Sequence, residues 1–288
     1  MTNKEKIARL FEKNIHLIKC PFCNSSMKVA ELKSLVCINN HTFDIAKQGY
    51  VNLLTRPVIS QYDKNLFQTR RNIITESDFF TPLHQKVVEF ITTHINYDIE
   101  NPIIFDAGCG EGSHLTKILS TLKNTMTGIG LDISKEGIQM AARYDKESIW
   151  LVGDLANTPL TDESCHVILN ILSPANYQEF NRLLAPKGVV IKVVPRTKYL
   201  RELRETLNLD EKKPQTNEKI IDLFKEHFHI TEKVELSYTK KLEKAEFVNL
   251  VQMSPLSWNV GKEELNKVID LDISEMTVDL ELLIGINN

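Results

Sequence analysis

The chain has 288 residues, of which 42% are hydrophobic and 25% charged, and its formal net charge is −3. These proportions are those of an ordinary soluble globular protein, and the length allows one large α/β domain with a smaller appendage. The sequence contains no apolar run long enough to cross a bilayer and no signal-peptide core near its start. We therefore expect a cytoplasmic protein with no membrane partner.

The charge is unevenly distributed along the chain. Residues 1–72 contain 12 Lys and Arg residues but five Asp and Glu residues, a balance of +7, whereas the remainder carries −10. A basic front on an acidic body favours contact between the N-terminal segment and a polyanion. A solvated surface with no partner would have the same balance, so the charge alone does not decide.

Residues 1–18 form the first predicted unit. Apolar residues recur there at helical spacing, with Lys and Glu among the residues between them. The apolar set is Ile7, Leu10, Phe11, Ile15 and Ile18. An amphipathic helix of this kind needs a surface to cover, either the segment that follows it or a second subunit. The sequence therefore leaves a homodimer open.

Residues 19–56 are predicted to form a zinc-binding domain. Cys20 and Cys23 form a Cys-x-x-Cys knuckle, and Cys37 and His41 supply a second pair of ligands for one tetrahedral Zn²⁺. A closed four-ligand site is structural, because it holds together a segment too short to form its own core. The competing interpretation, a redox-active Cys-x-x-Cys, accounts for neither Cys37 nor His41.

Residues 57–101 are predicted to connect the zinc-binding domain to the rest of the chain through two helices. Apolar residues at helical spacing place the first helix around residues 66–74. Thr81 and Pro82 predict the start of the second helix, with Thr81 as its N-cap and its end at His94.

Residues 102–288 begin with the stretch that points most directly to a ligand. An apolar run at residues 103–105 predicts a buried parallel strand, and the residues that follow it are Asp106, Gly108, Gly110, Glu111 and Gly112. Glycines allow a sharp turn from strand to helix and let a ligand lie against the backbone. The two carboxylates would repel a pyrophosphate but suit a cationic or zwitterionic ligand.

Acidic residues also end the next two predicted strands. Asp132 follows residues 126–131, where an acid binds ribose hydroxyls in this kind of sheet. Asp154, with Leu155 beside it, follows residues 150–152 and suits an adenine amino group. Three acids after three strands resemble the S-adenosylmethionine site of class I methyltransferases. We therefore expect an α/β fold with a Rossmann-like sheet of that class and an N-terminal zinc-binding domain; a dinucleotide or nucleotide-sugar domain is the alternative.

The remaining elements follow from apolar patterns. Four further strands are predicted at residues 166–172, 189–194, 230–242 and 276–284, the last two as an antiparallel pair at the sheet edge. Ser134 is expected to cap a helix that ends at Tyr144. A helix between the last two strands is expected to pack in the core together with Trp258.

Several motifs resemble those of the zinc-finger 23S rRNA (guanine-N1)-methyltransferases. They cover the chain from Cys20 onward in the family's order, at residues 20–23, 37–41, 43–54, 70–71, 80–83, 106–112, 131–134 and 250–258. The resemblance implies that the protein binds Zn²⁺ and transfers a methyl group from S-adenosylmethionine to guanine N1. It implies that this guanine lies in a hairpin loop of 23S ribosomal RNA near the peptide exit tunnel. In some members of the family the modification confers macrolide resistance.

The resemblance also implies roles for individual residues. The family places an aromatic residue matching Phe80 against the cofactor, and a residue matching Tyr199, often His, lies near it. Ser173 and Pro174 resemble the short proline-containing loop on which the target base is presented. This loop is not the Asn-Pro-Pro-Tyr sequence of exocyclic-amine methyltransferases, which weakens an adenine-N6 interpretation.

The implied chemistry needs a proton acceptor, because guanine N1 is protonated at neutral pH. Glu179 is one candidate for this catalytic role, and a backbone carbonyl together with water is the other. The guanine must be unpaired or flipped out of a helix, so we expect aromatic stacking in the pocket, with Phe79 and Tyr177 as candidates.

Five basic residues are candidates for holding RNA phosphates. Arg70 and Arg71 end the basic front, and Arg196, Lys198 and Arg201 follow the fifth predicted strand at the open end of the sheet. A solvated helix start would explain the second group equally well.

Two other functions remain open on the sequence. A methyltransferase that acts on a small molecule would share the cofactor motifs but would need neither a zinc finger nor a basic front. A non-enzymatic zinc-finger RNA-binding protein could retain the cofactor fold. The presence of both Asp106 and Asp132 argues against such a decayed site.

Overall fold

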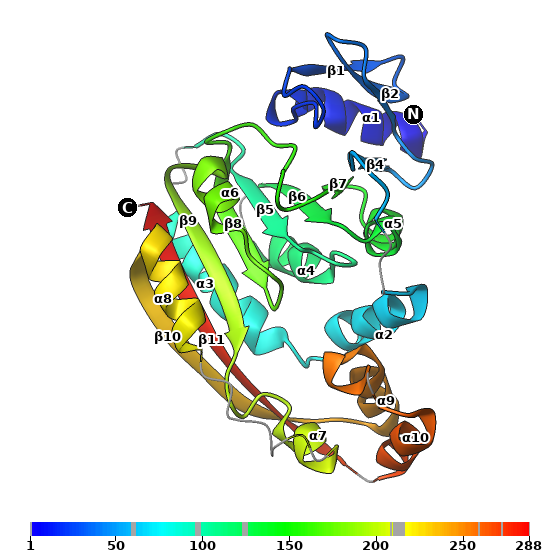
Figure 1. Cartoon of the computed structure of the whole chain (residues 1–288), viewed down its shortest axis with the longest axis vertical. Helices are drawn as coiled ribbons and strands as arrows, with labels where there is room; N and C mark the ends of the chain where they lie inside the picture. The colour runs from blue at the N-terminus through cyan, green and yellow to red at the C-terminus, as the bar shows by residue number, and fades with distance from the viewer. Residues whose placement is uncertain are drawn as a thin grey trace.

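The computed structural model describes residues 2–58, 62–95, 99–122, 126–207, 209, 217–258, 260–271 and 273–287 (Figure 1). Within these residues, no helix is both long enough and apolar enough to span a membrane.

The N-terminal unit is a helix packed on a small sheet. Its elements are α1 (Asn3–Lys13), a 3₁₀ turn (Ile15–Leu17), β1 (Met27–Ala30), β2 (Ser34–Cys37) and β3 (Thr42–Asp44), with the strands antiparallel in the order β1-β2-β3. We call the three strands and their connecting turns the ribbon. Thr2 and Glu5 form a capping box at the start of α1. Ile7, Ala8 and Phe11 of α1 are buried within this chain, so α1 covers its own ribbon and needs no second subunit.

The body is built on one eight-stranded sheet in the order β10-β11-β9-β8-β5-β6-β7-β4. The strands are β4 (Tyr50–Asn52), β5 (Ile103–Ala107), β6 (Thr127–Asp132), β7 (Ile149–Val152), β8 (Cys165–Ile171), β9 (Leu184–Pro195), β10 (Phe228–Lys241) and β11 (Glu275–Asn287). All neighbouring pairs are parallel except the two that involve β11. The predicted antiparallel pair at the edge, β10 and β11, is confirmed.

Strand β5 lies at the point where the chain reverses its direction across the sheet. After β5 the chain goes to β6 and β7 on one side, and then returns to β8 and β9 on the other. In open α/β sheets, ligands bind outside the carboxyl ends of the strands at this reversal. The glycine-rich stretch that follows β5 is therefore where a ligand site is expected.

Apolar residues cover both faces of the parallel strands, as expected for a sheet buried on both sides. On one face Ile104, Val167 and Ile191 share a core with most of the helices; on the other, Phe105 and Ile168 share a core with α1, the ribbon, α6 and α8. The helices are α2 (Lys64–Thr75), α3 (Thr81–His94), α4 (Ser113–Thr121), α5 (Lys135–Tyr144), α6 (Tyr177–Leu183), α7 (Arg201–Thr206), α8 (Glu218–His227), α9 (Lys244–Met253) and α10 (Lys262–Asp270). Figure 1 shows α1 and the ribbon at one end of the molecule and α7 and α10 at the other.

Three details differ from the sequence expectations. Strand β4, which falls within the predicted zinc-binding segment, joins the edge of the body sheet parallel to β7. Thr81 is the first residue of α3 instead of its cap, and Phe80 occupies the N-cap position without a side-chain hydrogen bond. Trp258 is 44% exposed and contacts the Tyr62 ring, so the prediction that it belongs to the core is wrong. Ser134 caps α5 as predicted, through the backbone N–H of Gly137.

Candidate active site and metal centre

The four predicted metal ligands converge at one end of the ribbon: Cys20 and Cys23 precede β1, whereas Cys37 ends β2 and His41 lies in the turn before β3. The Nδ1 atom of His41 lies 3.4 Å from the sulfurs of both Cys20 and Cys37, and the Cys23 and Cys37 sulfurs are 3.7 Å apart. All four ligand atoms lie within 4.8 Å of one another. A tetrahedral zinc with ordinary bond lengths separates its sulfur and nitrogen ligands by about 3.5–3.8 Å. The geometry therefore fits a closed Cys₃His zinc site.

The glycine-rich stretch forms a tight turn between β5 and α4. Gly108 and Gly112 have φ values of +78° and +76°, a left-handed conformation that glycine adopts without strain. A Cβ atom at Gly108 would lie 2.9 Å from the Ser173 side chain, and one at Gly112 would lie 2.9 Å from the Cβ of Ala141. The turn is therefore packed too closely against its neighbours for any other residue.

Asp132 binds this turn from the end of β6. One carboxylate oxygen accepts a hydrogen bond from the Gly110 backbone N–H at 2.8 Å, and the other accepts from the Ser134 N–H at 2.8 Å. Burial raises the pKa of Asp132, and these two hydrogen bonds oppose the shift. Burial also raises the pKa of Asp106, to about 7, against the opposing charge of Arg70. Two predicted cofactor-binding acids thus lie at the same buried turn.

Arg70 lies inside this acidic site. Its guanidinium forms an ion pair with Glu111, whose side chain is fully buried, and reaches the Cys109 carbonyl at 3.4 Å. The Arg70 side chain, predicted to bind RNA, is 19% exposed and is engaged by Glu111. The other Glu111 oxygen, Oε1, is buried and has no hydrogen-bond partner among the described residues.

The remaining predicted cofactor contacts lie at differing depths. Asp154 follows β7, is half-buried, and accepts a hydrogen bond from the Ala156 N–H at 2.8 Å. Leu155 lies 3.8 Å from the position of a Cβ at Gly108, so it adjoins the turn. Tyr199 is partly buried. Burial raises its pKa, and the nearby positive charge of Arg70 opposes this shift.

Phe80 is 1% exposed and packs under the turn. Its ring centroid lies 5.1 Å from that of His114, in the first turn of α4. His114 Nδ1 is in turn 2.8 Å from His84 Nε2. Burial lowers the pKa of both histidines, to about 4 for His84, so the pair is neutral at physiological pH. Phe80 is therefore connected to the glycine turn through its contact with His114.

The loop after β8 carries the predicted acceptor residues. Ser173 Oγ donates to the Ala107 carbonyl at 2.9 Å, and Pro174 is exposed. Two buried side chains bind this loop from the sheet: Asn170 Nδ2 donates to the Pro174 carbonyl, and Lys192 Nζ donates to the Ser173 carbonyl. Neither residue was predicted from the sequence, although a lysine in the middle of an apolar strand is a recognisable signal.

Other candidates for the acceptor side are engaged elsewhere. Glu179 accepts hydrogen bonds from the Thr158 N–H and from Arg182, which forms an ion pair with it at 2.7 Å. Burial raises the pKa of Glu179, but these hydrogen bonds outweigh it and lower the pKa overall. Glu179 is thus held as a structural carboxylate and is a poor proton acceptor. Phe79 and Tyr177, predicted to stack on the base, are 0% and 6% exposed, so neither offers an open ring face.

Comparison with known proteins identifies the family. A zinc-ribbon model described as RlmA, N-terminal, matches residues 18–60, and a methyltransferase-domain model matches residues 104–188. A Bacillus subtilis protein named as a candidate 23S rRNA (guanine-N1)-methyltransferase, YxjB, is 40% identical over 273 residues, 93% of this chain and 96% of its own. This chain belongs to the 23S rRNA (guanine-N1)-methyltransferase family.

A second family member is the 23S rRNA (guanine(748)-N1)-methyltransferase of Streptomyces fradiae, 29% identical over 256 residues, 88% of this chain and 90% of its own. A solved structure of a candidate methyltransferase from Bacillus halodurans is 15% identical, covers 70% of this chain and 98% of its own, and gives a TM-score of 0.47. The predicted class I methyltransferase fold with an N-terminal zinc-binding unit is confirmed, and with it the two expected cofactors, S-adenosylmethionine and Zn²⁺.

Most cations predicted to hold RNA in this family member have intramolecular partners. Arg71 lies over the Tyr144 ring, 3.7 Å from its centroid. Arg196 pairs with Asp279 and Glu235 at 2.8 and 2.9 Å, and Arg201 pairs with Glu202 and Glu205 at 3.3 and 3.5 Å. Lys198 alone of the five is an exposed side chain that forms no ion pair with another described residue.

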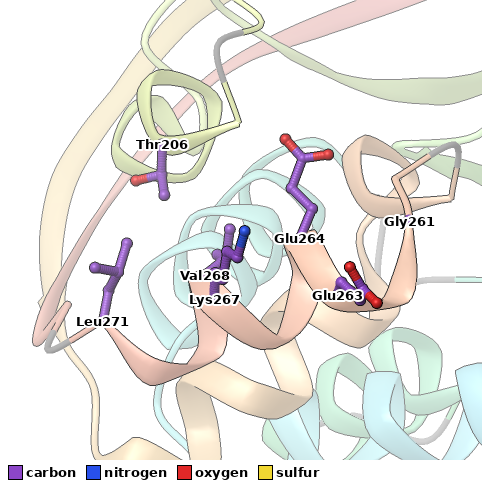
Figure 2. Close-up of a pocket in the computed structure, with 7 residues that line it drawn as sticks. All are labelled: Thr206, Gly261, Glu263, Glu264, Lys267, Val268 and Leu271. Atoms are coloured by element: carbon purple, nitrogen blue, oxygen red, sulfur yellow. The ribbon is translucent and has the colours of Figure 1, made fainter.

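The surface hollows of the described structure include one near α10 and one near the start of α5. One, of about 550 Å³, lies between α7 and α10, where Figure 2 shows Thr206 opposite Glu264 and Val268; none of the predicted site residues lines it. The other, of about 540 Å³, lies between residues 52–58, which follow the ribbon, and residues 133–136 at the start of α5. Arg56 and Lys135, both exposed, line this hollow. Another lining residue, Ile133, directly follows Asp132 in the chain.

Proposed function

We propose that this protein transfers a methyl group from S-adenosylmethionine to N1 of a guanine in a hairpin loop of 23S ribosomal RNA. The observation that carries the proposal is the buried acidic turn formed by Asp106, Glu111 and Asp132, in the same chain as a closed Cys₃His site. Carboxylates around a glycine turn attract a positively charged ligand, and the names of the two family members supply the substrate.

When bound, S-adenosylmethionine supplies a methyl group on a positively charged sulfur, so the protein mainly has to align donor and acceptor and exclude water. We assign the ribose hydroxyls to Asp132 and the adenine to Asp154 and Leu155, at the ends of β6 and β7. Phe80 and Tyr199 line the same cofactor site. The free Oε1 of Glu111 is suited to the ammonium of the cofactor's amino-acid group.

On the acceptor side, the loop that contains Ser173 and Pro174 presents the guanine. Because Glu179 is held by Arg182, we assign the N1 proton to water or to a backbone carbonyl of this loop. The backbone carbonyls of Ser173 and Pro174 each accept one hydrogen bond from a buried side chain, which fixes their direction.

For RNA binding we propose the ribbon together with three exposed cations. Arg56 and Lys135 line the hollow between residues 52–58 and the start of α5, and Lys198 follows the end of β9. Cations in this arrangement fit a phosphate backbone that runs from the zinc site toward the acidic turn. The protein would act in the cytoplasm, where ribosomes are assembled. A homodimer stays a sequence-based prediction, checked by sedimentation of the purified protein.

The test is a methylation assay on unmodified 23S rRNA with methyl-labelled S-adenosylmethionine, followed by reverse transcription. N1-methylguanine blocks base pairing, so we expect label in the RNA and a polymerase stop at one loop guanine, both absent with Asp132→Ala. Label transferred only to small molecules would favour the small-molecule methyltransferase. RNA binding without any transfer of label would favour the non-enzymatic alternative.

A further inference from the structure

Lys192 is a buried cation with neutral partners. It lies in the middle of β9, is 5% exposed, and its Nζ atom donates hydrogen bonds to the side-chain oxygen of Asn170 and, at 2.6 Å, to the Ser173 carbonyl. Burial is the only influence that shifts its pKa, which falls to about 8. No charged group of the described residues therefore compensates the ammonium.

Fold stability does not explain a lysine at this position. Burying an ammonium without an anionic partner costs several kcal/mol, and a well-packed apolar residue of similar volume is often neutral or stabilising there. The neighbours of Lys192 along β9 are Val and Ile residues, so an apolar side chain at position 192 would match its surroundings. The charge is thus expected to serve the loop that it contacts.

Asn170 extends this contact to the rest of the loop. Asn170 and Lys192 are direct partners in the register of β8 and β9. The Asn170 amide donates to the carbonyls of Ala107 and Pro174, both at 2.9 Å, and to Ser173 Oγ at 2.6 Å. The two side chains together bind the acceptor loop to the end of β5, immediately before the glycine turn.

The loop needs such support because its backbone is not relaxed. Leu172 has a φ of +51°, a left-handed conformation that is unfavourable for a non-glycine residue. Ser173 packs so closely on the turn that a Cβ at Gly108 would lie 2.9 Å from its side chain. A small shift of Ser173 would therefore change the distance between acceptor loop and cofactor turn.

We propose that Lys192 is a positioning residue for the methyl acceptor. The inference rests on the proposed function, because it assumes that this loop presents the guanine. The ammonium holds the Ser173 carbonyl directly and the Pro174 carbonyl through Asn170. Guanine N1 is thereby kept in line with the transferred methyl group, and an error of about 1 Å in such an alignment can cost on the order of 100-fold in rate.

The first test replaces Lys192 with the apolar residue of similar length, Lys192→Met. We expect kcat on the rRNA hairpin to fall by about 30- to 100-fold, while the Kd for S-adenosylhomocysteine and the melting temperature stay near those of the wild type. Lys187→Met, an exposed lysine of the same strand, makes the same change in charge and should leave kcat unchanged.

Two further measurements separate positioning from a structural role. Asn170→Ala should lower kcat similarly, and the double variant should be little slower than either single variant, because both act through one loop. As the pH rises through about 8, wild-type Lys192 loses its charge, so the ratio of wild-type to Lys192→Met activity should fall. Should Lys192→Met not fold, Asn170→Ala carries the same expectation.

The inference is overturned if Lys192→Met is as fast as the wild type, or if it loses cofactor affinity in the same proportion as kcat. It is also overturned if the effects of Lys192→Met and Asn170→Ala multiply. Failure of the proposed function would show itself differently, because the wild-type protein would then leave the rRNA unmethylated.

Discussion

The guanidinium of Arg70 is paired with one oxygen of the buried Glu111 carboxylate, while the other oxygen of that carboxylate has no partner among the described residues. Asp106 and Asp132 lie close enough to shift the pKa of the same guanidinium. One cation thus faces three carboxylates. A zwitterion with an ammonium and a carboxylate would complete this set, its ammonium on Glu111 and its carboxylate on Arg70.

The first prediction concerns Arg70. Arg70→Met should weaken binding of S-adenosylhomocysteine by about 10- to 100-fold, because a hydrogen bond to a charged group contributes about 1.5–3 kcal/mol. Binding of 5′-methylthioadenosine, which lacks the amino-acid group, should change little. Titration calorimetry with the two ligands measures both. Arg71→Met is the matched control, since the Arg71 guanidinium lies over Tyr144. Equal losses for both ligands would contradict the assignment.

The second prediction follows from the raised pKa of Asp106. Its folded-state pKa of about 7 lies above the ordinary 3.8, so protonated Asp106 stabilises the ligand-free fold at low pH and this contribution is lost as the pH rises through 7. Only the ionised form attracts an ammonium. The affinity for S-adenosylhomocysteine should therefore rise about tenfold between pH 6 and pH 8, whereas Asp106→Asn should bind weakly at both. A wild-type affinity that does not change between pH 6 and pH 8 would contradict the role of Asp106 in binding the ligand.

Local patterns in the sequence were sufficient to predict which residues form the zinc site and the acidic turn. The spacing of Cys20, Cys23, Cys37 and His41 needs only a short hairpin to close, and the acids stand at the carboxyl ends of strands that are apolar runs in the sequence. Parallel strands bring their carboxyl ends to one edge of the sheet, so the approximate position of these acids followed from the order of the elements alone.

The ion-pair partners of the basic residues could not be predicted from local sequence patterns. Arg70 meets Glu111 across 41 positions of sequence, and Arg196 meets Asp279 across 83, through the register of β9 and β11. Whether an arginine is free for RNA is decided by these distant pairings. The same holds for the aromatic rings: Tyr177 is buried because Phe224 and Phe228, about 50 residues later in the chain, pack against it.

The third prediction concerns the metal. Cys37→Ser should release the zinc and weaken binding to the rRNA hairpin, with the Kd for S-adenosylhomocysteine nearly unchanged, because the acidic turn lies in the body. Elemental analysis should give one zinc per chain for the wild type and for the control Cys165→Ala, which alters a buried cysteine outside the ribbon.

Loss of the zinc should also lower the melting temperature of the whole chain. Leu35 and Phe43 of the ribbon share one core with Val51 and Phe105 of the body sheet, so the two units are expected to unfold together. Separate transitions for ribbon and body in a thermal scan of the wild type would contradict this coupling, and a wild-type protein without zinc would contradict the metal site.

The last prediction concerns the close packing of the glycine turn. Gly112→Ala places a Cβ within 2.9 Å of the Ala141 Cβ and closer still to the Trp150 ring, at a φ of +76°. Overpacking and the left-handed backbone together should reduce the free energy of unfolding by about 2–4 kcal/mol. Gly261→Ala is the control, because no atom of the described residues other than its chain neighbours lies within 4 Å of its Cβ position, and its φ is −65°. Denaturant unfolding measures both. Equal stabilities for the two variants would mean that the backbone of the turn can shift to accommodate a Cβ atom. The cofactor would then have no rigid backbone to lie against.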